Sequence, residues 1–200
     1  RILAWGAFTI GLVPYIAGPV LKFAATGFEA LEVGVMAGSF IAVLILFIVP
    51  ITLLGTISPF AIRLSVDDTS KAGQISGQIY AISTLGSFIG TFLPTLVTIP
   101  TVGTKLTFFG FGMFLLIVAL IGLARFASPR EMFKLIWMPL VLIAVAVLSA
   151  GQSLKNSAGQ VYETESAYNY IQVQRQSGYT LLKLNDGQGV HSMYHPDTLN

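Results

Sequence analysis

The chain has 200 residues, of which 54% are hydrophobic and 10% are charged, and its formal net charge is +2. Because soluble domains carry about 25% charged residues, this composition excludes an ordinary soluble domain, and its hydrophobicity excludes a disordered chain. The small net charge gives no basis for nucleic-acid binding, and the absence of cysteine excludes disulfides and thiolate metal sites. The first residue is Arg1 rather than Met, so we expect an internal fragment of a longer protein.

Hydrophobic residues are concentrated before Ala150, and residues 1–150 are predicted to form an α-helical integral membrane bundle. A helix needs about 20 apolar residues to cross the bilayer core, and about five segments are long enough. The expected spans are approximately Ile2–Phe23, Val33–Leu64, Gly73–Pro100, Leu106–Leu123 and Phe133–Ala150. The interiors of these segments hold no clear charge, which argues against an ion-coupled pump.

The third expected span carries small residues at a spacing of four. They are Gly73, Gly77 and Ala81, followed by Gly86 and Gly90. This spacing lets two helix backbones approach closely in lipid, so these residues are predicted to be helix-packing positions. Tight packing in a static bundle and a sliding helix of a transporter both agree with the pattern.

The basic residues of the expected loops predict the orientation. One side carries Arg1, Arg63, Lys71, Arg125, Arg130 and Lys134, and the other carries Lys22, Lys105 and Lys155. Because cytoplasmic loops are enriched in Lys and Arg, the first side is predicted to be cytoplasmic and the C-terminal tail extracytoplasmic. Before the third span, Asp67 and Asp68 are either functional carboxylates or a solvated turn that caps the next helix.

Residues 160–200 follow a polar linker at 151–159 and are predicted to form a small antiparallel β-meander. The expected strands are Tyr168–Gln174, Tyr179–Leu184 and Gln188–Tyr194, with turns at Ser177-Gly178 and Asn185-Asp186-Gly187. A domain of about 40 residues seldom folds alone. The meander therefore needs the rest of a domain, another chain or the membrane part as a partner.

Two histidines, His191 and His195, stand four residues apart, a spacing that suits a metal pair only on a helix. Gly189 before them and Pro196 after them favour strand or loop, and no third ligand is evident. No metal site is predicted, and a hydrogen-bonded histidine in a polar site is favoured. The chain has no nucleotide-binding glycine motif and no G-x-S-x-G motif, so no catalytic residue is assigned.

Two parts of the chain resemble known proteins. YETESAYNYIQVQ, followed by GYTLLKLNDGQGVHSMYHPDT, resembles the N-terminal β-domain of spermidine synthases, the polyamine aminopropyltransferases. SPFAIRL, followed by GQISGQIYAISTLGSFIGTFLPTLVTIPTVGT, is similar to bacterial membrane proteins in which major-facilitator-like helices are fused to such a domain. Together the two parts cover about Ser58 to Thr198.

The resemblance implies a membrane-anchored, spermidine-synthase-like transferase of the bacterial inner membrane. The substrate-binding residues that it implies are Asn169, Gln188, Tyr194 and His195. The family's glycine-rich loop for decarboxylated S-adenosylmethionine and its acidic catalytic residues do not occur within Arg1–Asn200. We therefore expect no cofactor and no aminopropyl transfer from this fragment alone, whereas the full-length protein would use that cosubstrate.

Two other functions agree with the residues. One is a non-enzymatic scaffold or subunit of a larger membrane assembly, and the other is a major-facilitator-like transporter. The expected partners are the lipid bilayer, the missing remainder of the β/α domain, and other membrane proteins or further copies of the chain. An extracytoplasmic tail conflicts with a cytoplasmic nucleoside cosubstrate, so the side of the membrane separates these functions.

Overall fold

The computed structural model describes residues 1–28, 34–66, 68–150, 158–166, 168–185 and 189–198. The chain divides into two compact units. They are Arg1–Thr91 with Phe108–Ala150, and Phe92–Thr107 with Gly151–Asn200. The described part of the first unit is helical, and the second unit joins an interrupted helix to an antiparallel sheet.

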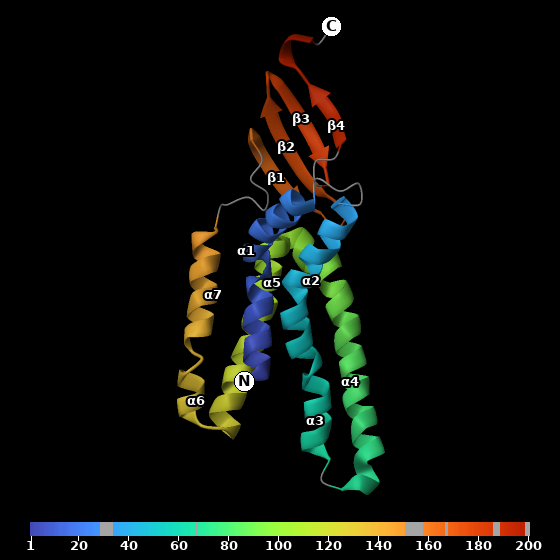
Figure 1. The fold of residues 1–200 in the computed structure, drawn as a ribbon, viewed down its shortest axis with the longest axis vertical. Helices are drawn as coiled ribbons and strands as arrows, with labels where there is room; N and C mark the ends of the chain where they lie inside the picture. Colours follow the sequence, from blue (N-terminus) through green and yellow to red (C-terminus); the bar gives the residue numbers. More distant parts are fainter. Residues whose placement is uncertain (29–33, 67, 151–157, 167, 186–188, 199–200) are drawn as a thin grey trace. The chain divides into compact units, whose positions relative to one another are not determined.

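The apolar part of the chain forms the helices drawn in Figure 1. These are α1 (Ile2–Phe28), α2 (Gly34–Gly55), α3 (Ile57–Ser65), α4 (Ala72–Leu93), α5 (Ile99–Phe126), α6 (Pro129–Phe133) and α7 (Trp137–Leu148). In the described residues, four helical stretches are long and apolar enough to cross a membrane: Ile2–Phe23, Met36–Ser65, Thr69–Phe126 and Pro129–Leu148. The predicted helical fold is confirmed, with four continuous stretches in place of about five.

The difference in number arises where the predicted spans Gly73–Pro100 and Leu106–Leu123 run together. They form one stretch of 58 residues, far longer than the about 20 residues of a single crossing. A π-helix at Pro94–Thr98 and the backbone of Gly103, with φ 82° and ψ 167°, interrupt this stretch. Because only glycine adopts a positive φ at low cost, Gly103 divides the stretch between the two predicted spans.

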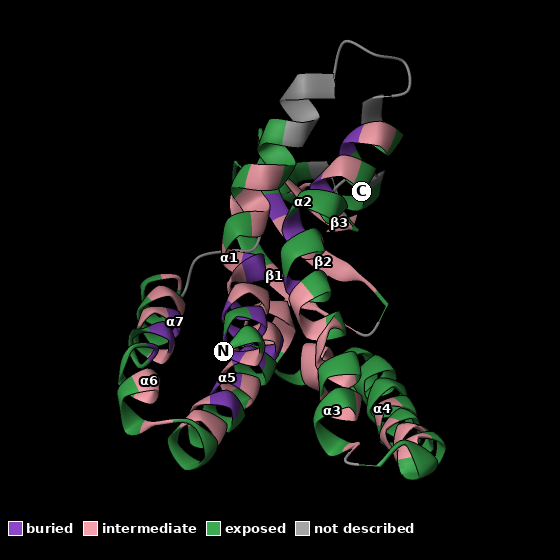
Figure 2. Cartoon of the chain, turned by 60° about the horizontal axis from the view of Figure 1, so that its bottom comes forward, coloured by how far each residue is buried: buried purple, intermediate pink, exposed green. Residues whose placement is uncertain are grey.

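The core of the first unit lies between α1, α5 and α7. Its buried residues are Ala4, Ala7, Phe8, Leu116, Ala119, Leu135, Met138 and Leu142. Figure 2 shows buried residues on these three helices, whereas the described residues of α3 and α4 include none. The rings of Trp5, Phe8 and Trp137 meet edge to face with centroids 5.1 to 6.2 Å apart, a favourable aromatic geometry.

Two glycines allow α1 and α5 to approach closely. A Cβ atom at Gly112 of α5 would lie 2.8 Å from the Cα of Gly11 and 3.0 Å from the carbonyl oxygen of Ala7, both on α1. Because the obstructing atoms belong to the backbone, only glycine fits at this contact. Neither glycine belongs to the small-residue pattern of the third expected span.

The small residues of α4 behave differently. A Cβ atom at Gly73, Gly77, Gly86 or Gly90 would meet no atom within 4 Å, and Ala81 is exposed. A hydrogen bond between the hydroxyls of Ser58 and Ser83, 3.2 Å long, links α3 to α4. Within the described chain this face of α4 is uncovered, and its role in helix packing stays a prediction.

The polar tail forms a sheet with the strand order β1-β2-β3-β4 and antiparallel pairing throughout (Figure 1). The strands are β1 (Gln160–Glu165), β2 (Tyr170–Gln176), β3 (Tyr179–Leu184) and β4 (Gly189–Tyr194), and a short 3-10 helix follows at Pro196–Thr198. The predicted antiparallel meander is confirmed, and β1 is an additional strand. Its pairing shifts register between Gln160 and Tyr162, which interrupts the regular alternation that reveals a strand in a sequence.

The turn between β2 and β3 has the predicted chemistry. Ser177 and Gly178 adopt φ angles of 52° and 86°, as in the tight two-residue hairpin turns that match the twist of a sheet. Asn185, after β3, has a φ of 47°. The other two residues of that predicted turn, Asp186 and Gly187, lie outside the described residues.

Candidate functional site

The two faces of β2 differ in chemistry. Tyr170, Gln172 and Gln174 alternate with Ile171 and Val173, so polar and apolar side chains lie on opposite faces. Gln172 is 4% exposed and Gln174 is 6% exposed, which makes them buried polar residues. A buried amide is tolerated only when it is hydrogen-bonded, so the polar face requires an internal network.

The network runs through side-chain amides and ends on a carboxylate. Gln174 Nε2 donates to Gln172 Oε1 at 2.9 Å, and Gln172 Nε2 donates to Gln160 Oε1 at 2.6 Å. Gln160 Nε2 then donates to Glu163 Oε2 at 2.8 Å, and the Tyr170 hydroxyl hydrogen-bonds the same oxygen. Gln172 and Gln160 each accept at Oε1 and donate from Nε2, and hydrogen bonds linked in this way polarise one another.

This network was not among the predicted site residues. A signal existed in the sequence, because polar residues at alternating positions of one strand imply a polar sheet face. Their partners on β1 could not be found that way, since β1 itself was not predicted. Chemically, the network locks β1 to β2 and holds the Glu163 carboxylate as an acceptor of hydrogen bonds.

A second carboxylate of β1 joins the sheet to the interrupted helix within the second unit. Glu165 accepts hydrogen bonds from the backbone N–H of Thr104 and, at 2.7 Å, from the Thr104 hydroxyl. A Cβ atom at Gly103 would lie 2.9 Å from the Glu165 carboxylate oxygen. Gly103 is therefore required both for its positive φ and for the approach of this carboxylate.

Threonines complete the hydrogen bonding around the break. The hydroxyl of Thr107, which is 5% exposed, donates to the carbonyl oxygen of Gly103 at 2.8 Å, and its oxygen lies 3.1 Å from the hydroxyl oxygen of Thr98. The N–H groups that follow a break behave like a helix N-terminus, where a carboxylate is stabilising. Glu165 thus caps the helical segment that continues from Thr104 through α5.

The predicted substrate-binding residues lie at two ends of the sheet. Asn169 is in the β1–β2 turn, where its side-chain oxygen accepts from Asn185 Nδ2 at 3.0 Å. Tyr194 and His195 are at the end of β4, beside the β2–β3 turn. The length of β2, roughly 20 Å, separates the two ends. Gln188 lies outside the described residues.

His195 is built into its end of the sheet. Its ring packs on Tyr179 with centroids 4.5 Å apart, and its Nδ1 accepts a hydrogen bond from the Asp197 N–H at 3.2 Å. A Cβ atom at Gly178 would lie 3.0 Å from His195 Nε2, so the turn glycine makes room for the imidazole.

His191 lies on β4 rather than on a helix, so the spacing of the two histidines does not bring them onto one helical face. Among the described residues, no group of three or more His, Cys, Asp or Glu side chains is placed to hold a metal ion. The described part of the sheet therefore offers amides, a phenol, an imidazole and carboxylates, which are groups that bind by hydrogen bonding.

In the loop before α4, the described acid is a turn cap. The Asp68 carboxylate accepts from the Ser70 N–H at 2.9 Å and from the Ser70 hydroxyl at 2.7 Å. The hydroxyl bond, followed by the backbone bond, lowers the pKa of Asp68 below its ordinary value. This geometry matches the capping interpretation of the loop, and Asp67 lies outside the described residues.

Comparison with known proteins adds no relative. No family model, curated protein or solved structure matches the chain. The candidate site is therefore defined by the contacts of this chain alone, at the carboxylates of β1 and at the Tyr194–His195 end of the sheet.

Proposed function

We propose that this chain is the membrane anchor and the opening β-region of a spermidine-synthase-like transferase. One observation carries the proposal. Apolar helices long enough to cross a membrane give way to a four-stranded antiparallel meander in the region that resembles the β-domain of that family. The helices would hold the module at the membrane, and the sheet would contribute one wall of its substrate site.

Within the sheet, the Tyr194–His195 end suits this role best. Tyr194 is 51% exposed, so its phenol is accessible to a ligand. His195 is oriented by Tyr179 and by the Asp197 N–H, which fixes its ring before any ligand arrives. Polar groups held in this way orient a substrate by hydrogen bonding. Asn169 is engaged by Asn185 at the other end, so we assign it to the turn.

The test uses the protein that contains this chain, purified in detergent. Release of methylthioadenosine is measured after addition of decarboxylated S-adenosylmethionine and putrescine. We expect turnover, with kcat/KM reduced about tenfold or more in Tyr194→Phe and His195→Gln. Tyr168→Phe is the matched control, because Tyr168 is 86% exposed in the turn at the other end.

Two results would contradict the transferase. One is the absence of methylthioadenosine release from the wild-type protein, and the other is an equal loss in all three variants. The location of Ser192 on β4 provides an independent check. A Ser192→Cys variant is treated with an impermeant maleimide in intact cells. Labelling would place the sheet outside the cell, where the nucleoside cosubstrate is absent, and would contradict the transferase.

A scaffold function is the second candidate, because the described residues of α4 include no buried residue. Four glycine positions on this helix meet no neighbour within the described chain. In an assembly, another membrane helix could pack on this face. Gly86→Leu would then dissociate the assembly in a size measurement, whereas a protein that purifies as a clean monomer would exclude this function.

A further inference from the structure

The connection between α5 and α7 combines basic and aromatic side chains. We call residues 125–134 the α5–α7 elbow. Its cations are Arg125, Arg130 and Lys134, and its aromatic residues are Phe126 and Phe133. Phe126 is 93% exposed and Phe133 is 62% exposed, so both rings project from the helical unit.

The elbow is an ordered turn. The N–H groups of Ala127 and Ser128 both donate to the Leu123 carbonyl oxygen at 3.1 Å, which ends α5. The Ser128 hydroxyl then accepts from the Arg130 N–H at 3.2 Å, and Pro129 begins α6. Serine at the cap and proline at the first helical position both favour this start. The exposed side chains are therefore carried on a defined backbone.

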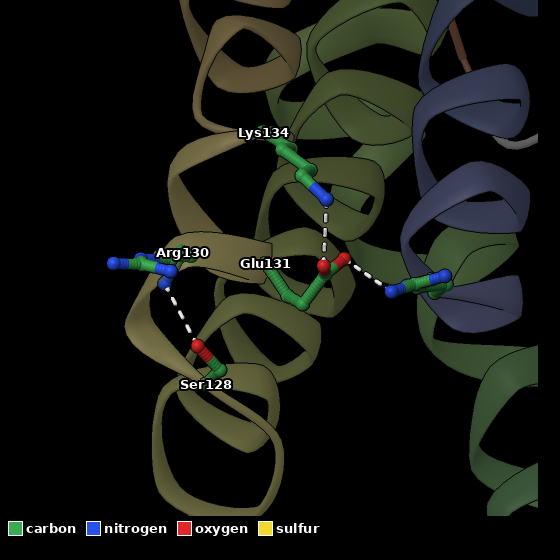
Figure 3. Close-up of polar contacts among 5 residues, drawn as sticks. Ser128, Arg130, Glu131 and Lys134 are labelled. Carbon is green, nitrogen blue, oxygen red and sulfur yellow. Dashed lines mark hydrogen bonds and ion pairs between the residues drawn. The ribbon is translucent and has the colours of Figure 1, made fainter.

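The charges of the elbow are divided into two groups. Glu131 binds Lys134 Nζ at 2.7 Å and also pairs with Arg1, the residue before α1, as Figure 3 shows. The Arg130 side chain points away from this cluster in the same view. Among the ion pairs of the described residues, none involves Arg125 or Arg130, and both are exposed. The elbow thus carries two exposed guanidinium groups and two exposed rings within ten residues.

The exposed arginines and phenylalanines of the elbow lie where two apolar helices, α5 and α7, are connected. Exposed phenylalanines of surface segments insert at the boundary between headgroups and acyl chains, and basic residues gather beside anionic leaflets. A guanidinium group matches a phosphate with two parallel hydrogen bonds. We propose that the α5–α7 elbow binds anionic phospholipid headgroups through Arg125 and Arg130, with Phe126 and Phe133 inserted beside them. The Glu131 cluster ties α6 to Arg1, and the Arg130 side chain points away from that cluster.

The proposal is tested with the purified protein in mixed micelles that contain either phosphatidylglycerol or phosphatidylcholine. Lipid retained per protein is counted by native mass spectrometry across a concentration series. A cation near an anionic surface contributes about fivefold in affinity. We therefore expect the double variant Arg125→Gln/Arg130→Gln to bind phosphatidylglycerol about 30-fold more weakly, with phosphatidylcholine retention unchanged.

Two control variants make the result specific. Lys22→Gln/Lys105→Gln removes the same charge from other parts of the chain and should retain the wild-type preference. Arg125→Lys/Arg130→Lys preserves the charge but not the paired guanidinium hydrogen bonds, so it should recover part of the affinity and bind more tightly than the glutamine variant. Full preference in the glutamine variant, or an equal loss in the Lys22/Lys105 control, would overturn the proposal.

Free phosphate is a second possible source of the same chemistry. Inorganic phosphate is added at rising concentration, and the retained phosphatidylglycerol is counted again. Headgroup binding predicts little displacement, because the inserted phenylalanines hold the lipid as well. Complete displacement at low millimolar phosphate, or wild-type lipid affinity in Phe126→Ser/Phe133→Ser, would mean that the elbow does not bind a membrane lipid.

Discussion

Two helices of the first unit, α1 and α4, both carry glycines, but they differ in what those glycines contact. A Cβ atom would lie 2.9 Å from the Leu54 side chain at Gly6 of α1 and 3.2 Å from the Leu142 side chain at Gly11, whereas at Gly86 and Gly90 of α4 it would meet no atom within 4 Å. The longer run of small residues four apart lies on α4, whereas the close backbone contact lies at Ala7 and Gly11 of α1. The spacing of small residues therefore shows that another helix could approach the backbone, whereas only the fold shows whether one does.

We expect the largest change in stability from a substitution at the crossing of α1 and α5. Gly112→Leu places a side chain against the α1 backbone, which cannot move aside as a flexible side chain can. We expect a loss of about 3 kcal/mol or more in the free energy of unfolding. Gly86→Leu in the isolated chain should cause no loss and add up to about 0.8 kcal/mol, because leucine is the better helix former and meets no neighbour there.

The measurement for both variants is detergent-induced unfolding followed by circular dichroism. Similar destabilisation of the two variants would show that the α4 face is covered in the isolated chain. If Gly86→Leu instead weakens association without changing the unfolding of the monomer, the scaffold function gains direct support.

A smaller effect is expected from a cavity in the same core. Leu142 is fully buried and contacts Gly11, so Leu142→Ala removes packing from the α1–α7 contact. Because lipid is as apolar as leucine, moving this side chain between protein and lipid changes the free energy little. The cavity left by the missing side chain should therefore account for the loss of stability, which we expect to be about 2 kcal/mol. Leu85→Ala on α4 is the control, since Leu85 is 65% exposed. A loss of equal size at both positions would contradict the assignment of the core.

In the second unit, the comparison concerns two carboxylates of the same strand. Glu165→Gln weakens the cap at Thr104, and we expect a local loss of about 1 kcal/mol because a charge-assisted bond becomes a neutral one. Hydrogen exchange of the Thr104 amide should become about fivefold faster. Glu163→Gln, which changes the amide network instead, should leave that amide unaffected. Unchanged exchange in Glu165→Gln would exclude the cap.

The smallest expected effect is the pH dependence of the Asp68 turn. The pKa of Asp68 is lower in the folded chain because the Ser70 hydroxyl and N–H stabilise the carboxylate. Its contribution is therefore present above the unfolded-state pKa and is lost as the pH falls through the folded pKa. Protection of the Ser70 amide should drop over that range, and Asp68→Asn should remove the pH dependence. If the protection factor of the Ser70 amide in the wild-type chain did not change with pH, this cap would be contradicted.

The parts of the fold that follow from short-range rules were predictable. Tyr179–Leu184 was predicted as a strand and is β3, and Ser177-Gly178 forms the predicted turn. The first strand was missed because its bulge hides the alternation. The polar network could not be predicted either, since Gln160 and Gln172 are brought together only by the pairing of β1 with β2.

The candidate site shows the same division. Tyr194 and His195 are neighbours in the sequence and share one end of the sheet, whereas Asn169 lies at the other end. The contact of Glu165 with Thr104 joins residues that are 61 positions apart in the chain. Neither residue stands out by itself, because a glutamate in a strand and a threonine after a glycine are both ordinary.

The amino-acid sequence by itself determined the apolar helices, the later strands and the tight turn, since these depend on hydrogen bonds and hydrophobicity within a few residues. Tertiary structure alone decided that Gly11 and Gly112 meet, that the glycines of α4 meet no neighbour among the described residues, and that Glu165 caps the break at Gly103. The physical reason is that packing depends on which faces of distant elements come together. A spacing pattern in the sequence describes one face of a helix or strand and does not identify the element that packs on that face.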